Sequence, residues 1–206
     1  MKKLYLLRHG QTEFNVKKLV QGRCDSPLTD LGRQQAAKAA AWLKAHDVVP
    51  EKVVSSPLGR AMDTASLVAA ELLGPDAAVE PCEGIIERCY GTFEEGPHDA
   101  LPTDVWDPGE DLVPFGGEGN RALQERMVGT LTNLMGAEGI ETLLAVSHGS
   151  ASRQFIKATA PEGFELPAKL PNCAIMIFSF EDSQEECDTS QGKFTLRQII
   201  DPQQSH

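Results

Sequence analysis

Short apolar runs alternate along the chain with longer segments in which apolar residues recur every three or four positions. Runs of this length, rich in β-branched and aromatic residues, are typical of β-strands. The three-and-four spacing instead predicts helices at about 30–46, 57–73, 120–135 and 151–160. The apolar runs are KLYLL (3–7), KVVSS (52–56), TLLAVSH (142–148), CAIMIFSF (173–180) and KFTLRQII (193–200).

This alternation predicts the fold class. Strands that alternate with helices form α/β folds, in which helices cover a mainly parallel sheet. We therefore expect a three-layer sandwich with a largely parallel, mixed central sheet and helices on both faces. The mixed character comes from the last two runs, which only the acidic loop EDSQEECDTSQG (181–192) separates, so that they can pair antiparallel.

Capping residues indicate where two of the helices begin. Thr29 is a favourable N-cap for the helix at 30–46. Ser56 is predicted to cap the next helix, with Pro57 in its first position, where a missing backbone N–H costs nothing.

Residues 96–119 have little periodicity and several prolines. A loop this long in a compact domain is typically a lid or a binding segment, and the alternative is an insertion without a role. We expect residues 1–206 to form a single domain with a lid-like insertion at about 96–119, because the chain is short enough for one core.

Composition and charge narrow the choice of partners and of location. The 206 residues are 41% hydrophobic, and no stretch approaches the roughly 18 apolar residues of a membrane span. The formal net charge of −11 argues against a nucleic-acid or membrane surface. The first residues predict no secretory signal, and five cysteines without a CxxC pair favour reduced thiols and a cytoplasmic location.

Two of the predicted strands end in the same way, as LLRHG (6–10) and AVSHG (145–149). The carboxyl ends of neighbouring strands in an α/β sheet meet at the ligand crevice, so we expect His9 and His148 to face one another there. Gly10 and Gly149 would let the backbone approach a ligand closely. The other histidines, at positions 46, 98 and 206, are predicted to be ordinary surface or hydrogen-bonded groups.

Arginines complete a cationic cluster at this edge of the sheet. Arg8 precedes His9, and Arg60 lies in the first turn of a helix that follows a strand. Together with His148 they form a set of donors suited to a tetrahedral oxyanion, to which Asn15 and Thr12 would add neutral donors. A local cationic pocket would allow an acidic protein to bind an anion.

The cluster favours nucleophilic catalysis over metal binding. The sequence has no HxH or HExxH motif, and arginines beside the site would repel a cation. Neighbouring cations lower the pKa of a histidine, so that one ring nitrogen stays unprotonated and can attack phosphorus. The other nitrogen would be held as N–H by an acceptor, such as a backbone carbonyl.

These segments together resemble the histidine phosphatase superfamily (phosphoglycerate mutase-like, RHG branch). The resemblance extends from residue 4 to about 150 and keeps the family's order of motifs. A lone RHG triplet is a weak signal, whereas the series of motifs is highly specific. The motifs are LLRHGQTEFN, QGRCDSPLTDLGRQQA, SSPLGRAMDTA, ERCYG and AVSHG.

The resemblance implies a role for each matching residue. His9 would become phosphohistidine, and Arg8, Arg60 and His148 would hold the phosphoryl oxygens. Glu87 would be the acid that protonates the leaving alcohol, and its apolar and acidic neighbours predict a raised pKa. No metal or cofactor is implied. The positions expected to contact phosphate or substrate are Asn15, Gln21, Gly22 and Tyr90.

Two activities share this catalytic core, a phosphatase and a cofactor-dependent phosphoglycerate mutase. ERCYG resembles the mutase version except for Cys89, where histidine is usual, but mutases of this type usually carry a longer middle insertion and tail. We therefore favour a metal-independent phosphatase that acts on a small phosphorylated metabolite. A non-catalytic phosphate-binding module is the alternative from another class, and the sequence predicts no oligomeric state.

Two cysteines near the predicted site raise a further question. Oxidation of Cys24 or Cys89 could inhibit the enzyme, and the alternative is a reduced thiol with a packing role.

Overall fold

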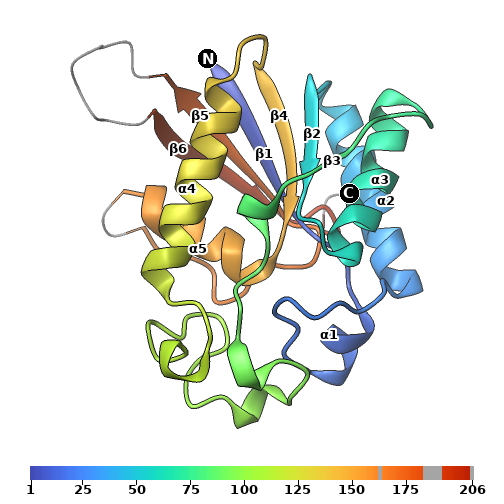
Figure 1. Cartoon of the computed structure of the whole chain (residues 1–206). Helices are drawn as coiled ribbons and strands as arrows, with labels where there is room; N and C mark the ends of the chain where they lie inside the picture. The colour runs from blue at the N-terminus through green and yellow to red at the C-terminus, as the bar shows by residue number, and fades with distance from the viewer. Residues whose placement is uncertain (162–163, 183–191, 205–206) are drawn as a thin grey trace.

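The computed structural model describes residues 1–161, 164–182 and 192–204. In these ranges the chain forms a six-stranded sheet with the order β3-β2-β4-β1-β5-β6 (Figure 1). The first four strands in this order run parallel, whereas β5 pairs antiparallel with β1, and β6 with β5. The strands are β1 Lys2–Arg8, β2 Lys52–Ser55, β3 Glu80–Pro81, β4 Thr142–Ser147, β5 Ile175–Glu181 and β6 Lys193–Ile200.

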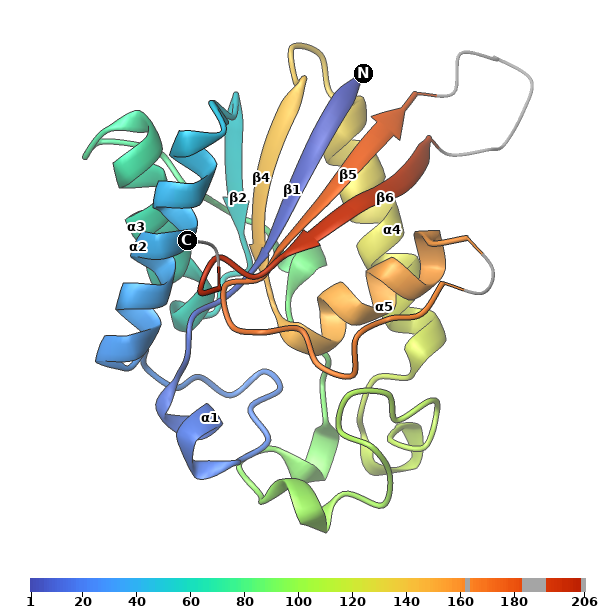
Figure 2. The same cartoon turned by 180° about the vertical axis from the view of Figure 1, so that it is seen from behind.

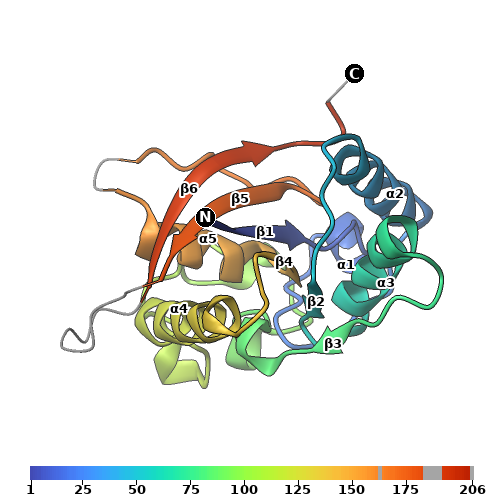
Figure 3. The same cartoon turned by 90° about the horizontal axis from the view of Figure 1, so that it is seen from above.

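Helices cover both faces of this sheet, as Figure 3 shows from above. The α-helices are α1 Glu13–Lys17, α2 Asp30–Ala45, α3 Gly59–Leu73, α4 Asn120–Gly136 and α5 Gly149–Thr159. Short 3-10 turns lie between α3 and α4, namely η1 Glu83–Ile85, η2 Gly91–Phe93, η3 His98–Ala100 and η4 Val113–Phe115. The three-layer α/β sandwich with a largely parallel, mixed sheet is thus confirmed.

The alternation of side chains along the strands divides the core in two. On β1, Leu4 and Leu6 join the cluster beneath α4 and α5, whereas Tyr5 and Leu7 join the cluster beneath α2 and α3. Successive strand residues point to opposite faces, so a strand covered on both sides must be apolar at nearly every position. This requirement explains the uninterrupted apolar run at the start of the chain.

One predicted helix start is wrong. Ser56 does not cap α3, because that helix begins only at Gly59. The carboxylate of Asp25 instead accepts the backbone N–H of Gly59 at 2.6 Å and that of Arg60 at 3.3 Å. Thr29 caps α2 as predicted, since its hydroxyl accepts the N–H of Gly32 at 3.0 Å.

Residues 96–119 lie beyond the carboxyl ends of the parallel strands, on the same side as α1 (Figures 1 and 2). Leu101 and Leu112 of this segment are buried with Val20 and Tyr90 in a small cluster separate from the main core. The segment is therefore packed onto the rest of the domain. Within the described ranges, none of the helices is both long and apolar enough to span a membrane.

Candidate active site

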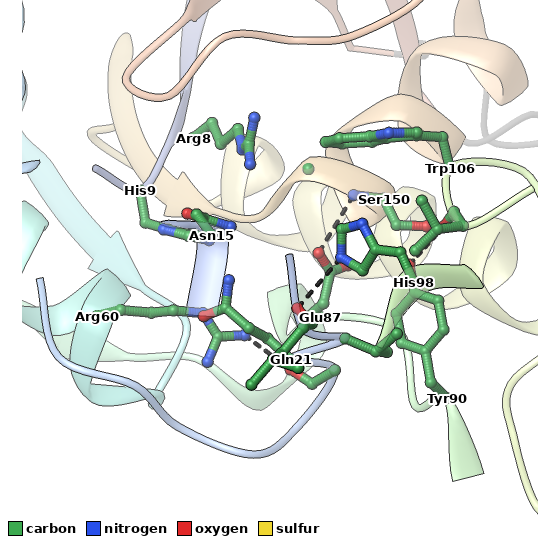
Figure 4. Close-up of a pocket in the computed structure, with 15 residues that line it drawn as sticks. Arg8, His9, Asn15, Gln21, Arg60, Glu87, Tyr90, His98, Trp106 and Ser150 are labelled. Carbon is green, nitrogen blue, oxygen red and sulfur yellow. Dashed lines mark hydrogen bonds between the residues drawn. The ribbon is translucent and has the colours of Figure 1, made fainter. Parts of the chain in front are cut away.

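A cavity of about 60 Å³ opens at the carboxyl edge of the parallel strands, between this edge and the 96–119 segment (Figure 4). Most of the predicted site residues line it, and His148, which is not one of the lining residues, is in ring contact with His9. The lining residues are Arg8, His9, Asn15, Leu19, Val20, Gln21, Gly22, Arg60, Glu87, Tyr90, His98, Val105, Trp106, Gly149 and Ser150.

The sheet register brings the two imidazoles together. Arg8 on β1 pairs with Ser147 on the parallel neighbour β4, so the next residues, His9 and His148, leave the sheet side by side. Their ring centroids lie 5.1 Å apart, and the ring planes are inclined by 61°. The predicted encounter of two residues 139 positions apart is confirmed.

The imidazole of His9 is held with one nitrogen free. Its Nδ1 lies 2.7 Å from the carbonyl oxygen of Gly10, so Nδ1 carries the hydrogen and Nε2 keeps its lone pair. Burial, and then the charges of Arg60 and Arg8, lower the pKa of His9 well below its ordinary value. The ring is therefore neutral at physiological pH, with Nε2 available as a nucleophile.

Gly10 must be a glycine for this arrangement to form. A Cβ at this position would lie 2.5 Å from the carbonyl oxygen of Gly32, which is backbone and cannot give way. The N–H of Gly10 donates to the hydroxyl of Thr64 on α3 at 3.1 Å. The backbone of Gly10, whose carbonyl oxygen accepts the ring N–H of His9, is thereby packed between α2 and α3.

Three buried side-chain nitrogens beside His9 have no hydrogen-bond partner among the described residues. They are Nε of Arg8, Nε of Arg60 and Nδ1 of His148. A buried polar group left without a hydrogen bond costs about 1–3 kcal/mol, so three in one place indicate a site that a ligand completes. Three convergent donors are suited to the oxygens of a tetrahedral anion.

Each arginine is fixed by its remaining nitrogens. Arg8 donates to the carbonyl of Leu170, and its guanidinium lies 5.1 Å from the ring centre of Trp106. Arg60 donates to the carbonyls of Gly22 at 2.7 Å and Cys24 at 2.8 Å. Burial lowers the pKa of Arg8 to about 10, so that it remains a cation near neutral pH.

The carboxylate of Glu87 lies at the N-terminus of α5. It accepts the backbone N–H groups of Arg88 and Ala151 at 2.8 Å and that of Ser150 at 3.2 Å. These backbone donors fix the carboxylate at the wall of the cavity, and the residues next to Glu87 in the sequence did not indicate the two that come from α5.

The side chains of Asn15, Gln21 and Tyr90 line the cavity but are already hydrogen-bonded. The Oδ1 of Asn15 accepts the N–H of Thr12 at 3.1 Å, and the Oε1 of Gln21 accepts the Thr12 hydroxyl at 3.0 Å. Thr12 itself does not line the cavity, so it is not the donor expected there. The Tyr90 hydroxyl donates to the carbonyl of Val105 at 2.7 Å. In the hydrogen bonds of the described residues, the side-chain amide nitrogens of Asn15 and Gln21 have no acceptor, so they can donate to a ligand.

Gly22 contributes its backbone. Its carbonyl receives Arg60, its φ is +52°, and a Cβ would lie 2.2 Å from the carboxylate of Glu94. A side chain at this position would therefore disturb the loop that orients Arg60.

The sequence did not identify the residues that the 96–119 segment brings to the cavity. Trp106 covers Arg8, and His98, expected to be an ordinary histidine, lines the cavity with Nε2 3.2 Å from the carbonyl of Leu19. Asp107 anchors this part of the segment to α4 and α5 by accepting hydrogen bonds from Asn120, Gln154 and Lys157. The tryptophan in the predicted lid is the sequence signal from which a contribution of this segment to the site could have been expected.

The structure opposes a redox role for Cys24. Its thiol donates to Glu94 at 3.2 Å, and burial together with Glu94 raises its pKa to about 12. A reactive cysteine needs the opposite shift, towards the thiolate. Cys89 lies 3.5 Å from the carbonyl of Gly116, and its redox role stays a prediction. Cys187 lies outside the described residues.

In the described part of the chain, no group of three or more His, Cys, Asp or Glu side chains is arranged to hold a metal ion. The positive groups around His9 would also repel a cation.

Known proteins resemble this chain in sequence. The family model for the histidine phosphatase superfamily (branch 1) matches residues 4–191. A broad-specificity phosphatase of Saccharomyces cerevisiae is 31% identical over 158 residues, which cover 75% of this chain and 69% of that protein. A probable phosphoglycerate mutase of Escherichia fergusonii is 31% identical over 193 residues, which cover 89% of this chain and 87% of that protein.

A solved structure agrees with the fold. A phosphoserine phosphatase variant from Entamoeba histolytica, in complex with phosphoserine, has a TM-score of 0.74 and 28% identity, and 98% of each chain is covered. The family model spans nearly the whole chain, and its range, residues 4–191, includes both strands that end in His-Gly. The chain therefore belongs to branch 1 of the histidine phosphatase superfamily.

Proposed function

We propose that the protein is a metal-independent phosphatase that hydrolyses a small phosphorylated metabolite through a phosphohistidine on His9. One observation carries this proposal. The free Nε2 of a neutral, buried His9 lies beside three unpartnered side-chain nitrogens, those of Arg8, Arg60 and His148. A nucleophile and a set of oxyanion donors in one buried place are what phosphoryl transfer requires.

In the first half of the reaction, the lone pair of His9 Nε2 forms a bond to phosphorus as the ester P–O bond breaks. Arg8, Arg60 and His148 hold the three non-bridging oxygens, and the two guanidinium groups balance their charge. Glu87 takes up the proton that the substrate monoanion brings. It then gives this proton to the leaving alkoxide. The products of this half are an alcohol and phosphohistidine.

In the second half, water attacks the phosphorus of the phosphohistidine. Glu87, now a carboxylate that the amides of α5 stabilise, accepts a proton from the attacking water. The P–N bond breaks, and its electron pair returns to Nε2 of His9. Inorganic phosphate then leaves together with the proton that Glu87 took from the water, so Glu87 is a carboxylate again. The enzyme ends as it began.

The lining of the cavity supports a phosphatase over a mutase. Among the described residues that line it, Arg8 and Arg60 are the cationic side chains, and both are engaged with the phosphoryl site. A phosphoglycerate mutase must in addition bind a substrate carboxylate. The outer wall is instead largely apolar, with Val20, Val105 and Trp106.

Two other functions are candidates for this site. The match to probable phosphoglycerate mutases over 89% of the chain supports a mutase as the second candidate. A non-catalytic phosphate-binding module is disfavoured because the nucleophile, the acid and the oxyanion donors are all present.

The proposal extends to organisation and location. We propose a single catalytic domain in which residues 96–119 act as the lid, since this segment carries Trp106 over Arg8. The cytoplasmic location expected from the cysteines stays a prediction.

The decisive experiment follows the phosphoryl group through the enzyme. The protein is mixed with a panel of ³²P-labelled phosphoesters, which includes 3-phosphoglycerate, phosphoserine and glycerol phosphate, and is quenched within milliseconds to seconds. We expect label on the protein that is lost in acid and retained in base, followed by release of inorganic phosphate. His9→Ala should abolish both signals.

A matched control is His46→Ala, because His46 is exposed and stacks on Trp42 away from the cavity. This variant should label and turn over like the wild type. Interconversion of phosphoglycerates faster than phosphate release would establish the mutase instead. An unlabelled protein whose phosphate binding survives the His9 change would establish the binding module.

A further inference from the structure

Ser56 has a role that its sequence position did not indicate. It is fully buried directly after β2, and its hydroxyl oxygen lies 2.7 Å from Nε2 of His148. The helix that it was predicted to cap begins three residues later and is capped by Asp25. The hydroxyl is therefore available to the second histidine of the site.

We propose that Ser56 is a positioning residue that fixes the tautomer of His148, so that the hydrogen of the ring lies on Nδ1 and is donated to a phosphoryl oxygen. This inference rests on the proposed function in one respect, the identity of the anion. The hydrogen-bond assignment itself rests on the contacts of Ser56 and His148.

The hydrogen bonds of Ser56 indicate the direction of the contact. Its oxygen accepts the backbone N–H of Leu58 at 3.4 Å, so its own hydrogen is free to be donated. In the hydrogen bonds described for this hydroxyl, the remaining partner is Nε2 of His148. Nε2 is therefore the acceptor of the pair.

An imidazole that accepts at Nε2 and is neutral must carry its hydrogen on Nδ1. Burial, and then the charges of Arg60, His9 and Arg8, lower the pKa of His148 well below its ordinary value, which supports the neutral form. Nδ1 is buried and has no partner in the described part of the chain. It is the one ring nitrogen left to meet a ligand.

The other tautomer would present a lone pair at Nδ1 to the phosphoryl oxygens. Two acceptors would then face each other in a buried site, where an unmade hydrogen bond is most costly. The choice of tautomer therefore decides whether His148 attracts or repels the transferred group.

The backbone keeps Ser56 and His148 in register. The N–H of Ser56 donates to the carbonyl of Val146 on β4 at 2.9 Å, two residues before His148. The hydroxyl of the preceding Ser55 donates to the carbonyl of Ser56 at 2.9 Å. The distance between the hydroxyl and the imidazole is thus set by the pairing of two neighbouring strands.

The direct test is the protonation state of His148 in the unliganded wild-type protein. With ¹⁵N-labelled histidine, long-range ¹H–¹⁵N NMR distinguishes a ring nitrogen that carries hydrogen from one that does not, and His148→Gln identifies the signal. We expect hydrogen on Nδ1 and a lone pair on Nε2. A wild-type ring with its hydrogen on Nε2 would overturn the proposal, and this measurement needs no variant of Ser56 to fold.

Ser56→Ala and Ser55→Ala form a matched pair for the functional test. Both remove a fully buried hydroxyl at neighbouring positions, but Ser55 donates to a backbone carbonyl and not to His148. We expect Ser56→Ala to mix the two tautomers and to weaken orthovanadate binding and kcat/KM by about 10- to 100-fold. Ser55→Ala should change stability by a similar amount while tautomer and activity stay as in the wild type.

A double variant separates positioning from a general structural effect. In a His148→Gln background, Ser56→Ala should cause little further loss of activity, because the partner through which it acts is gone. Independent, multiplicative losses would contradict the proposal. If the wild type hydrolysed no phosphoester at all, the proposed function would fail, yet the tautomer measurement would still decide the assignment.

Discussion

Two buried imidazoles next to two guanidinium groups make folding sensitive to pH. The pKa values of His9 and His148 are lowered by burial and by Arg60 and Arg8. In the unfolded chain a histidine titrates near 6.5. As the pH falls below about 6.5, the unfolded state therefore takes up protons that the folded state cannot, and stability is lost until the pH reaches the folded-state pKa values.

We expect the free energy of unfolding to fall by roughly 1.4 kcal/mol per histidine between pH 7.5 and pH 5.5. Urea unfolding at the two pH values measures the loss. His9→Gln and His148→Gln should each reduce it, because the titrating group is absent, whereas His46→Gln at an exposed position should leave it unchanged. An equal loss in all four proteins would show that the two buried rings are not responsible.

Among the secondary-structure elements, α2 and α3 offer a comparison of two helix caps. Thr29 caps α2 with its own hydroxyl, whereas the cap of α3 comes from Asp25, 34 residues away in the chain. Asp25 also lies 3.3 Å from the guanidinium of Arg60. Thr29 thus stabilises only a helix, whereas Asp25 stabilises a helix and also orients the oxyanion donor Arg60.

We expect Thr29→Ala and Asp25→Ala each to lower stability by about 1 kcal/mol, the usual effect of losing an N-cap. Only Asp25→Ala should also lower kcat/KM, by about 10-fold or more, because Arg60 loses its orientation. Thermal unfolding and steady-state kinetics on both variants measure the two effects. Wild-type kinetics in Asp25→Ala would refute the link between cap and site.

At the scale of the whole molecule, the site is assembled from segments across the chain. Arg8 ends β1 and His9 follows it, Arg60 lies in the first turn of α3, Glu87 follows η1, and His148 precedes α5. Because these residues come together only on folding, the anion binds the folded state and not the unfolded chain. Ligand binding must therefore raise the stability of the entire domain, by about 2.7 kcal/mol at 100 times Kd.

We expect orthovanadate, a tetrahedral oxyanion, to raise the Tm in proportion to the logarithm of its concentration. The shift should persist in protein that has been dialysed against EDTA and then freed of the chelator, because the proposed site uses no metal. Arg60→Ala should lose most of the shift, which separates site binding from general salt effects. Loss of the shift after EDTA treatment would indicate a metal requirement.

The sequence alone predicted five of the six strands in the described part of the chain, the fold class and the membership of the site in broad terms. The two-residue strand β3 was not predicted. Strand β1 is predictable because a strand covered on both faces is apolar at each position. Arg8, His9 and His148 are predictable because parallel strands deliver their carboxyl ends to one edge. These features depend on local periodicity and on the topology that α/β folds share.

Only the tertiary structure decided what surrounds each of these residues. The amides of Ser150 and Ala151 that bind Glu87, the hydroxyl of Ser56 beside His148, and Trp106 over Arg8 all lie far away in the chain from the groups they contact. Hydrogen bonds act over about 3 Å and depend on direction, so no spacing along a sequence specifies them. Periodicity thus predicts which residues reach the edge of the sheet, and tertiary packing decides their hydrogen-bond partners and protonation states.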